Sequence, residues 1–150
     1  MRDDDETESD GRAVHTSTFW AALVMCMIMG LPSSAQVPSK PVTFTNAQAE
    51  RGRDLYVRSC VDCHGHDLDN GEFGGAPLRG SHFRSRWGDA PAENLFAYLS
   101  ATMPPDRPGQ LSTQTYADIM AYMLMRNGYQ AGSQDLPGDL DALGKMTIER

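Results

Sequence analysis

Cysteine is scarce in this chain of 150 residues, and the spacing of the three that are present excludes a disulfide framework. They are Cys26, Cys60 and Cys63, whereas a framework normally has four or more cysteines at separated positions.

The sequence also lacks a cluster of basic residues. The formal net charge is −7, and it becomes about −3 when the first twelve residues, six acidic and two basic, are set aside. The chain therefore has no electrostatic route to nucleic acid, which we exclude as a partner.

Alternating apolar and polar residues, the pattern of a half-buried strand, are absent from the sequence. Low-complexity segments are absent as well. The composition, 40% hydrophobic with 14 Gly and 9 Pro, is typical of one globular domain with many turns. We therefore expect an all-α domain with three principal helices and long loops. Three short helices bury little apolar surface, so such a core would benefit from a large apolar guest.

An uncharged apolar run at residues 19–31 precedes this domain. It is shorter than the roughly 17 to 25 residues of a membrane span, and the small residues Ser33 and Ala35 after it resemble a signal-peptidase site. We predict a signal peptide over residues 1–35, despite its acidic start, and a periplasmic mature protein. An uncleaved membrane anchor is the alternative. Lipid attachment at Cys26 is disfavoured because the preceding Met25 is not small.

Proline and capping signals divide the rest of the chain. Residues 36–45 contain two prolines and predict an extended arm. Thr45, with Gln48 three residues later, predicts an N-cap, a capping box and a helix to about residue 59. The glycine-rich residues 68–80 predict a surface loop.

Two more helices are expected. A short one, capped by Asp89 or a neighbour, ends before Met103 because the next residue is a proline. Ser112 caps the last long helix, in which apolar residues recur at spacings of three and four before Asn127-Gly128 ends it. The domain then covers residues 46–128. The tail, residues 129–150, is expected to pack on it, with one short helical turn after Pro137.

Residues 60–64, Cys-Val-Asp-Cys-His, form the C-x-x-C-H pattern of c-type haem attachment. Two thiols three positions apart at a helix end can both reach the vinyl groups of a haem, and the next residue places its imidazole under the iron. We predict covalent attachment of one haem c through Cys60 and Cys63, with His64 as an iron ligand. A zinc site would have only His66 and His82 to complete it, and a thioredoxin-like dithiol would need a βαβ setting, so both alternatives are weaker.

The second axial ligand of the iron is expected from a distant part of the chain. Met103 is favoured because the two prolines after it make a stiff, extended segment that holds its thioether at a fixed point. His82 is the alternative. Met120 and Met123 fit the pattern of methionines that fill gaps in a core. The other candidates are Met125, Met146 and His66, the last of which is too near His64 in the chain.

Taken together, these residues resemble the class I c-type cytochromes, and most closely the small monohaem domains that accept electrons beside, or fused to, bacterial quinoprotein alcohol dehydrogenases. The resemblance covers roughly residues 46–129 and implies a cytochrome c-like fold wrapped around one covalent haem, with single-electron transfer as its activity. Its marks are Gly52, Tyr56, Cys60 to His64, Leu78-Arg79-Gly80, Trp87, Thr102-Met103-Pro104, residues 108–112 and residues 116–128.

The resemblance also implies roles for residues around the haem. Gly52 lets the first and last helices cross closely, with Tyr56 packed beside them. Leu78 touches the haem, and Trp87 lies near a propionate. In many relatives a proline two positions before the matching leucine offers its carbonyl to the ligand histidine, and here that position is Ala76.

Three arginines, Arg79, Arg84 and Arg86, cluster in the same region. Either they form a solvated surface, or they pair with haem propionates or steer an acidic partner. We expect the protein to carry electrons between a dehydrogenase, such as a quinoprotein, and a respiratory acceptor, such as a terminal oxidase. The alternatives are a haem subunit docked on a dehydrogenase through the tail, and an open-site haem enzyme such as a peroxidase.

Overall fold

The computed structural model describes residues 39–69, 71 and 73–149. The chain divides into two units, Met1–Gln36 and Val37–Arg150, and all the described residues belong to the second. The signal peptide predicted for residues 1–35 and the start of the predicted arm lie outside the described residues. Within the described part of the chain, no helix is long and apolar enough to cross a membrane.

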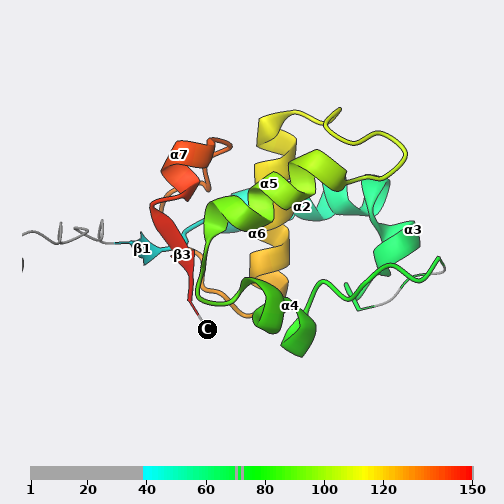
Figure 1. Ribbon diagram of the computed structural model, residues 1–150, viewed down its shortest axis with the longest axis horizontal. Helices are drawn as coiled ribbons and strands as arrows, with labels where there is room; N and C mark the ends of the chain where they lie inside the picture. Colours follow the sequence, from blue (N-terminus) through cyan, green and yellow to red (C-terminus); the bar gives the residue numbers. More distant parts are fainter. Residues whose placement is uncertain (1–38, 70, 72, 150) are drawn as a thin grey trace, which may run out of the picture. The chain divides into compact units, whose positions relative to one another are not determined.

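The described residues form six helices and one small sheet (Figure 1). The three longest helices are those that the sequence predicts, and the fold is all-α as expected. Every residue of the last long helix from Tyr116 to Leu124 is buried, which places that helix at the centre of the core. The helices are α2 (Asn46–Ser59), α3 (Val61–His64), α4 (Gly80–Trp87), α5 (Ala92–Thr102), α6 (Thr113–Arg126) and α7 (Leu140–Leu143).

Helix α2 begins where its capping residues predict, but half of the predicted capping box is wrong. The Thr45 side chain accepts a hydrogen bond from Gln48 N at 3.0 Å. The Gln48 side chain does not return to Thr45. Its Nε2 donates to Leu136 O at 2.9 Å, and its Oε1 accepts from Leu136 N at 2.6 Å. Gln48 is fully buried, so this paired contact fastens the tail of the chain to the first helix.

Helices α2 and α6 cross at Gly52. A Cβ atom at this position would lie 1.8 Å from the backbone oxygen of Asp118, so only glycine permits the approach. Beside the crossing, Arg51 Nε donates to Asp118 Oδ2 at 3.1 Å, and the rings of Tyr56 and Tyr122 pack with their centroids 5.4 Å apart. The structure confirms the roles expected for Gly52 and Tyr56. The crossing also fixes the direction of α2, and thereby the position of Cys60 at its end.

The region before α5 contains a helix that the sequence did not predict. Helix α4 was missed because Phe83 is its single buried residue and its sequence has no apolar stripe. The cap of α5 is Pro91, a near neighbour of Asp89, and Asp89 itself, with a φ of 62°, lies in the turn before the helix. The end of α5 is as predicted, since Met103 is the C-cap with extended geometry.

The tail is more regular than the sequence suggests. Helix α7 is the predicted short turn after Pro137. The strand β3 (Met146–Ile148) was not predicted, and it lies between β1 (Lys40–Pro41), to which it is parallel, and β2 (Ala90–Pro91), to which it is antiparallel. In Figure 1, this sheet and α3 lie at opposite ends of the described domain. Four side chains of the tail are buried in the core, those of Leu136, Leu143, Met146 and Ile148.

Candidate functional site

The Cys60–His64 motif lies at the junction of α2 and α3. Cys60 is the C-cap of α2, and its N–H donates to Tyr56 O at 2.8 Å. The next turn is α3, in which His64 N donates to Cys60 O at 3.0 Å. The two half-buried thiols and the imidazole therefore project from one tight turn of backbone, as attachment to a single flat group requires.

The imidazole of His64 is held by a backbone carbonyl. Its Nδ1 lies 2.8 Å from Ala76 O, and because a carbonyl only accepts hydrogen bonds, Nδ1 carries the proton. The lone pair of Nε2 is then available to a metal. Ala76 thus supplies the acceptor that a proline supplies in many relatives, since the contact needs only the backbone oxygen.

The loop after α3 reaches this position by passing very close to the motif. Gly75 N donates to Cys63 O at 2.6 Å, and a Cβ atom on Gly75 would lie 2.3 Å from the same oxygen. On the other side, the hydroxyl of Tyr56 donates to Gly65 O at 2.7 Å. Burial raises the pKa of Tyr56, so this hydroxyl stays protonated and remains a donor at neutral pH.

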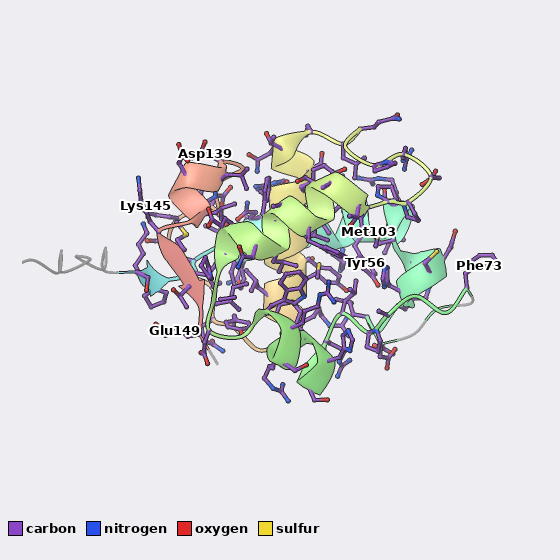
Figure 2. The ribbon with its side chains drawn as sticks, in the orientation of Figure 1. Tyr56, Phe73, Met103, Asp139, Lys145 and Glu149 are labelled. Carbon is purple, nitrogen blue, oxygen red and sulfur yellow. The ribbon has the colours of Figure 1, made fainter. Side chains whose placement is uncertain are left out.

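A pocket of about 570 Å³ opens beside the motif, within the range of roughly 300 to 1,000 Å³ that ligand sites occupy. Both cysteines and His64 line one side of it. Met103, at the end of α5, lines it as well (Figure 2). Apolar side chains from α5 and α6 complete the lining, among them Leu95, Leu99, Ile119 and Met123.

Two of the residues predicted to surround the haem, Leu78 and Trp87, line this pocket. Arg79 is not in the lining. Its side chain is exposed and donates from Nη1 to Asp67 O at 3.2 Å. His82, the alternative ligand, lines the pocket with an exposed side chain. The other candidate ligands among the described residues, Met120, Met125, Met146 and His66, do not line it.

Sequence reasoning missed several polar residues of the lining. Arg58 and Arg107 reach the pocket from the end of α2 and from the loop after α5. Of the clustered arginines only Arg86 is in the lining, and its guanidinium lies 5.0 Å from the ring of Trp87 and 4.9 Å from that of Tyr98. Each of the three arginines lies within four residues of a residue predicted for the site, Cys60, Met103 or Trp87, and this closeness in sequence is the signal that could have indicated them.

The competing interpretations of the cysteines receive no support. Among the described residues, no group of three or more His, Cys, Asp or Glu side chains is placed to hold a metal ion, as a zinc site would require. Burial, and then the nearby Cys63, raise the pKa of the Cys60 thiol to about 12. A redox-active dithiol instead depends on a lowered thiol pKa.

An all-α domain with a C-x-x-C-H turn, a carbonyl-bound histidine and a methionine on one largely apolar pocket is a c-type cytochrome domain. The family model described as cytochrome c oxidase, cbb3-type, subunit III matches residues 47–123, and the chain belongs to this family. Its fold is cytochrome c-like, its cofactor is a covalently bound haem c with iron, and its role is haem-based electron transfer. No curated protein and no solved structure matches the chain significantly.

Proposed function

We propose that this protein is a periplasmic carrier of single electrons, with its haem joined to Cys60 and Cys63 and its iron ligated by His64 and Met103. The observation that carries the assignment of the ligands is the shared pocket. Four residues from two distant segments of the chain line a single cavity whose remaining lining is largely apolar. The bound haem supplies reversible one-electron exchange at its iron.

The residues of this chain set the conditions for that exchange. Ala76 O holds the proton of His64 Nδ1 and thereby orients the ring. The thioether of Met103 is a soft ligand, and it favours the ferrous state and raises the reduction potential. The apolar side chains of α5 and α6 exclude water from the pocket.

We propose a dehydrogenase as the electron donor and a respiratory acceptor, such as a terminal oxidase, as the destination. Three large hydrophobic side chains of the pocket lining, Val57, Phe73 and Tyr98, are exposed at the surface. Figure 2 shows Phe73 at the outer edge of its loop. Small apolar contact surfaces of this kind suit the brief encounters of redox partners.

The assignment of Met103 is tested by the visible spectra of the holoprotein and of Met103→Ala, each oxidised and reduced. We expect a low-spin native spectrum with the weak, long-wavelength charge-transfer band of sulfur–iron ligation, and we expect Met103→Ala to lose this band. Met125→Ala is the matched control, because Met125 is half-buried and does not line the pocket. A native high-spin spectrum would favour the open-site enzyme, and loss of low-spin character in His82→Ala alone would make His82 the ligand.

Export is tested separately by the intact mass of the protein recovered from the periplasm. Cleavage after Ala35 predicts a mature chain that starts at Gln36. Recovery of the full-length chain in the membrane fraction would instead support the uncleaved anchor.

A further inference from the structure

The backbone oxygen of Met103 is bound by a buried side chain from another helix. The hydroxyl of Tyr116 donates to Met103 O at 2.7 Å, the usual distance for such a bond. Tyr116 belongs to the first turns of α6, and Met103 is the C-cap of α5. This one contact ties the end of α5, where the thioether originates, to the central helix of the core.

Tyr116 is itself held firmly. Its side chain is buried, and its ring meets that of Phe96 edge to face, with the centroids 6.4 Å apart. The start of α6 is fixed by Ser112, whose Oγ accepts from Thr115 N at 3.1 Å. The hydroxyl therefore offers a fixed point to the Met103 carbonyl.

The chain beyond Met103 offers less support. Residues 104–112 form no helix or strand, and most of them are exposed. On the other side, Met103 N donates to Leu99 O at 2.9 Å, within the last turn of α5. The bond from Tyr116 is thus the hydrogen bond that ties the Met103 backbone to another helix, in addition to the packing of the Met103 side chain against the core.

We propose that Tyr116 is a positioning residue that governs how tightly Met103 is retained on the iron. The proposal rests on the proposed function, in which Met103 is an axial ligand. An external ligand that displaces the thioether must shift the Met103 segment, and in the native protein that movement strains or breaks the bond to Tyr116. Without the hydroxyl, displacement costs less by roughly one hydrogen bond, which corresponds to about a twofold to tenfold change in affinity.

The probe is imidazole, titrated into the ferric holoprotein and followed by the visible spectrum. We expect Tyr116→Phe to keep the sulfur–iron band and to bind imidazole about twofold to tenfold more tightly than the native protein. Tyr122→Phe is the matched control. Tyr122 is a buried tyrosine of the same helix, and its hydroxyl contacts Arg126 rather than Met103. We expect its imidazole affinity to be native.

Equal imidazole affinities for Tyr116→Phe and the native protein would overturn the proposal, and so would an equal gain in Tyr122→Phe, because that would indicate general loosening. If Tyr116→Phe yields no holoprotein, Phe96→Leu takes its place, since it removes the ring that orients Tyr116 and should tighten imidazole binding in the same direction. Failure of the proposed function looks different. In that case the native protein has no sulfur–iron band and Met103→Ala binds imidazole as the native protein does.

Discussion

His64 and Met103 line the same pocket, yet the chain around His64 is held by many contacts and the chain around Met103 by few. We call the side of the pocket around His64 the histidine wall. There, Ala76 O accepts from His64 Nδ1, Gly75 N donates to Cys63 O, and the Tyr56 hydroxyl donates to Gly65 O. In the proposed holoprotein, Cys60 and Cys63 add the covalent attachment of the haem. We call the side around Met103 the methionine wall. There, Met103 N donates to Leu99 O within its own helix, and Met103 O accepts from the Tyr116 hydroxyl.

This difference separates two tasks. The histidine wall is redundant, so loss of one contact leaves the ring of His64 in place and is felt mainly as lost stability. The backbone of Met103 has one hydrogen bond to another helix, so we expect the loss of that bond to affect the proposed iron ligation directly. The same type of contact, a buried tyrosine hydroxyl on a carbonyl, should therefore have unlike consequences on the two walls.

The largest effect is expected where both walls share a support, at the crossing of α2 and α6. In Gly52→Ala the new Cβ meets the Asp118 backbone oxygen and forces the helices apart. We expect a loss of about 3 kcal/mol of unfolding free energy, because no flexible group can yield there. Urea denaturation measures it, with Ala47→Ser at an exposed position of α2 as control. A native midpoint for Gly52→Ala would contradict the observed crossing.

A large effect on stability that spares both walls is expected at Gln48. Gln48→Ala leaves the buried N–H and C=O of Leu136 without partners, which should cost about 2 to 3 kcal/mol. Neither residue lines the pocket, so the haem spectrum and imidazole affinity should remain native. Gln130→Ala, at an exposed site, is the control for urea denaturation. A changed imidazole affinity would show that the tail communicates with the iron.

An intermediate effect is expected at the outer support of the histidine wall. Asn127 donates to Leu78 O at 2.9 Å and accepts from Gly80 N at 2.9 Å, so it fastens the loop that carries Leu78 into the pocket. We expect Asn127→Ala to lose about 2 kcal/mol of stability, since several hydrogen bonds disappear together. Because the Met103 wall is intact, imidazole affinity should stay native. An increase equal to that of Tyr116→Phe would remove the distinction between the walls.

The smallest effect is the sharpest test of redundancy. Tyr56→Phe removes the hydroxyl that donates to Gly65 O and should cost about 1 kcal/mol. Since other contacts hold His64, imidazole affinity should stay within about twofold of native. Thermal unfolding and the imidazole titration, run beside those of Tyr116→Phe, give the comparison directly. If Tyr56→Phe weakens iron ligation as much as Tyr116→Phe, the histidine wall is not redundant.

The three main helices were predictable because each carries its own local signal. Thr45 and Ser112 cap α2 and α6 as their sequences indicate, and the proline after Met103 ends α5. Helix α4 carries no such signal, since Phe83 is its single buried residue. The strands are two or three residues long, which is too short to show an alternating pattern in the sequence. They also pair with segments that lie far away along the chain.

The haem-attachment and ligand residues that could be predicted lie in a short motif, residues 60–64, or next to the rigid proline segment after Met103. The structure brings Cys60, Cys63, His64 and Met103 to one pocket, as the prediction requires. Arg58 and Arg107 were missed although they lie close in sequence to Cys60 and Met103, because a charged side chain beside a motif can face either the pocket or the solvent. The neighbours in sequence of Arg86 gave no indication that only this arginine of its cluster would enter the lining.

The order of strands in the small sheet bears on how the chain assembles. β1 and β2 do not pair with each other, and each finds its partner in β3, which is synthesised long after both. The sheet therefore needs the C-terminal tail, because neither β1 nor β2 has a partner without β3. β3 alone therefore links the segment before α2 to the segment before α5, two parts of the chain that do not pair with each other.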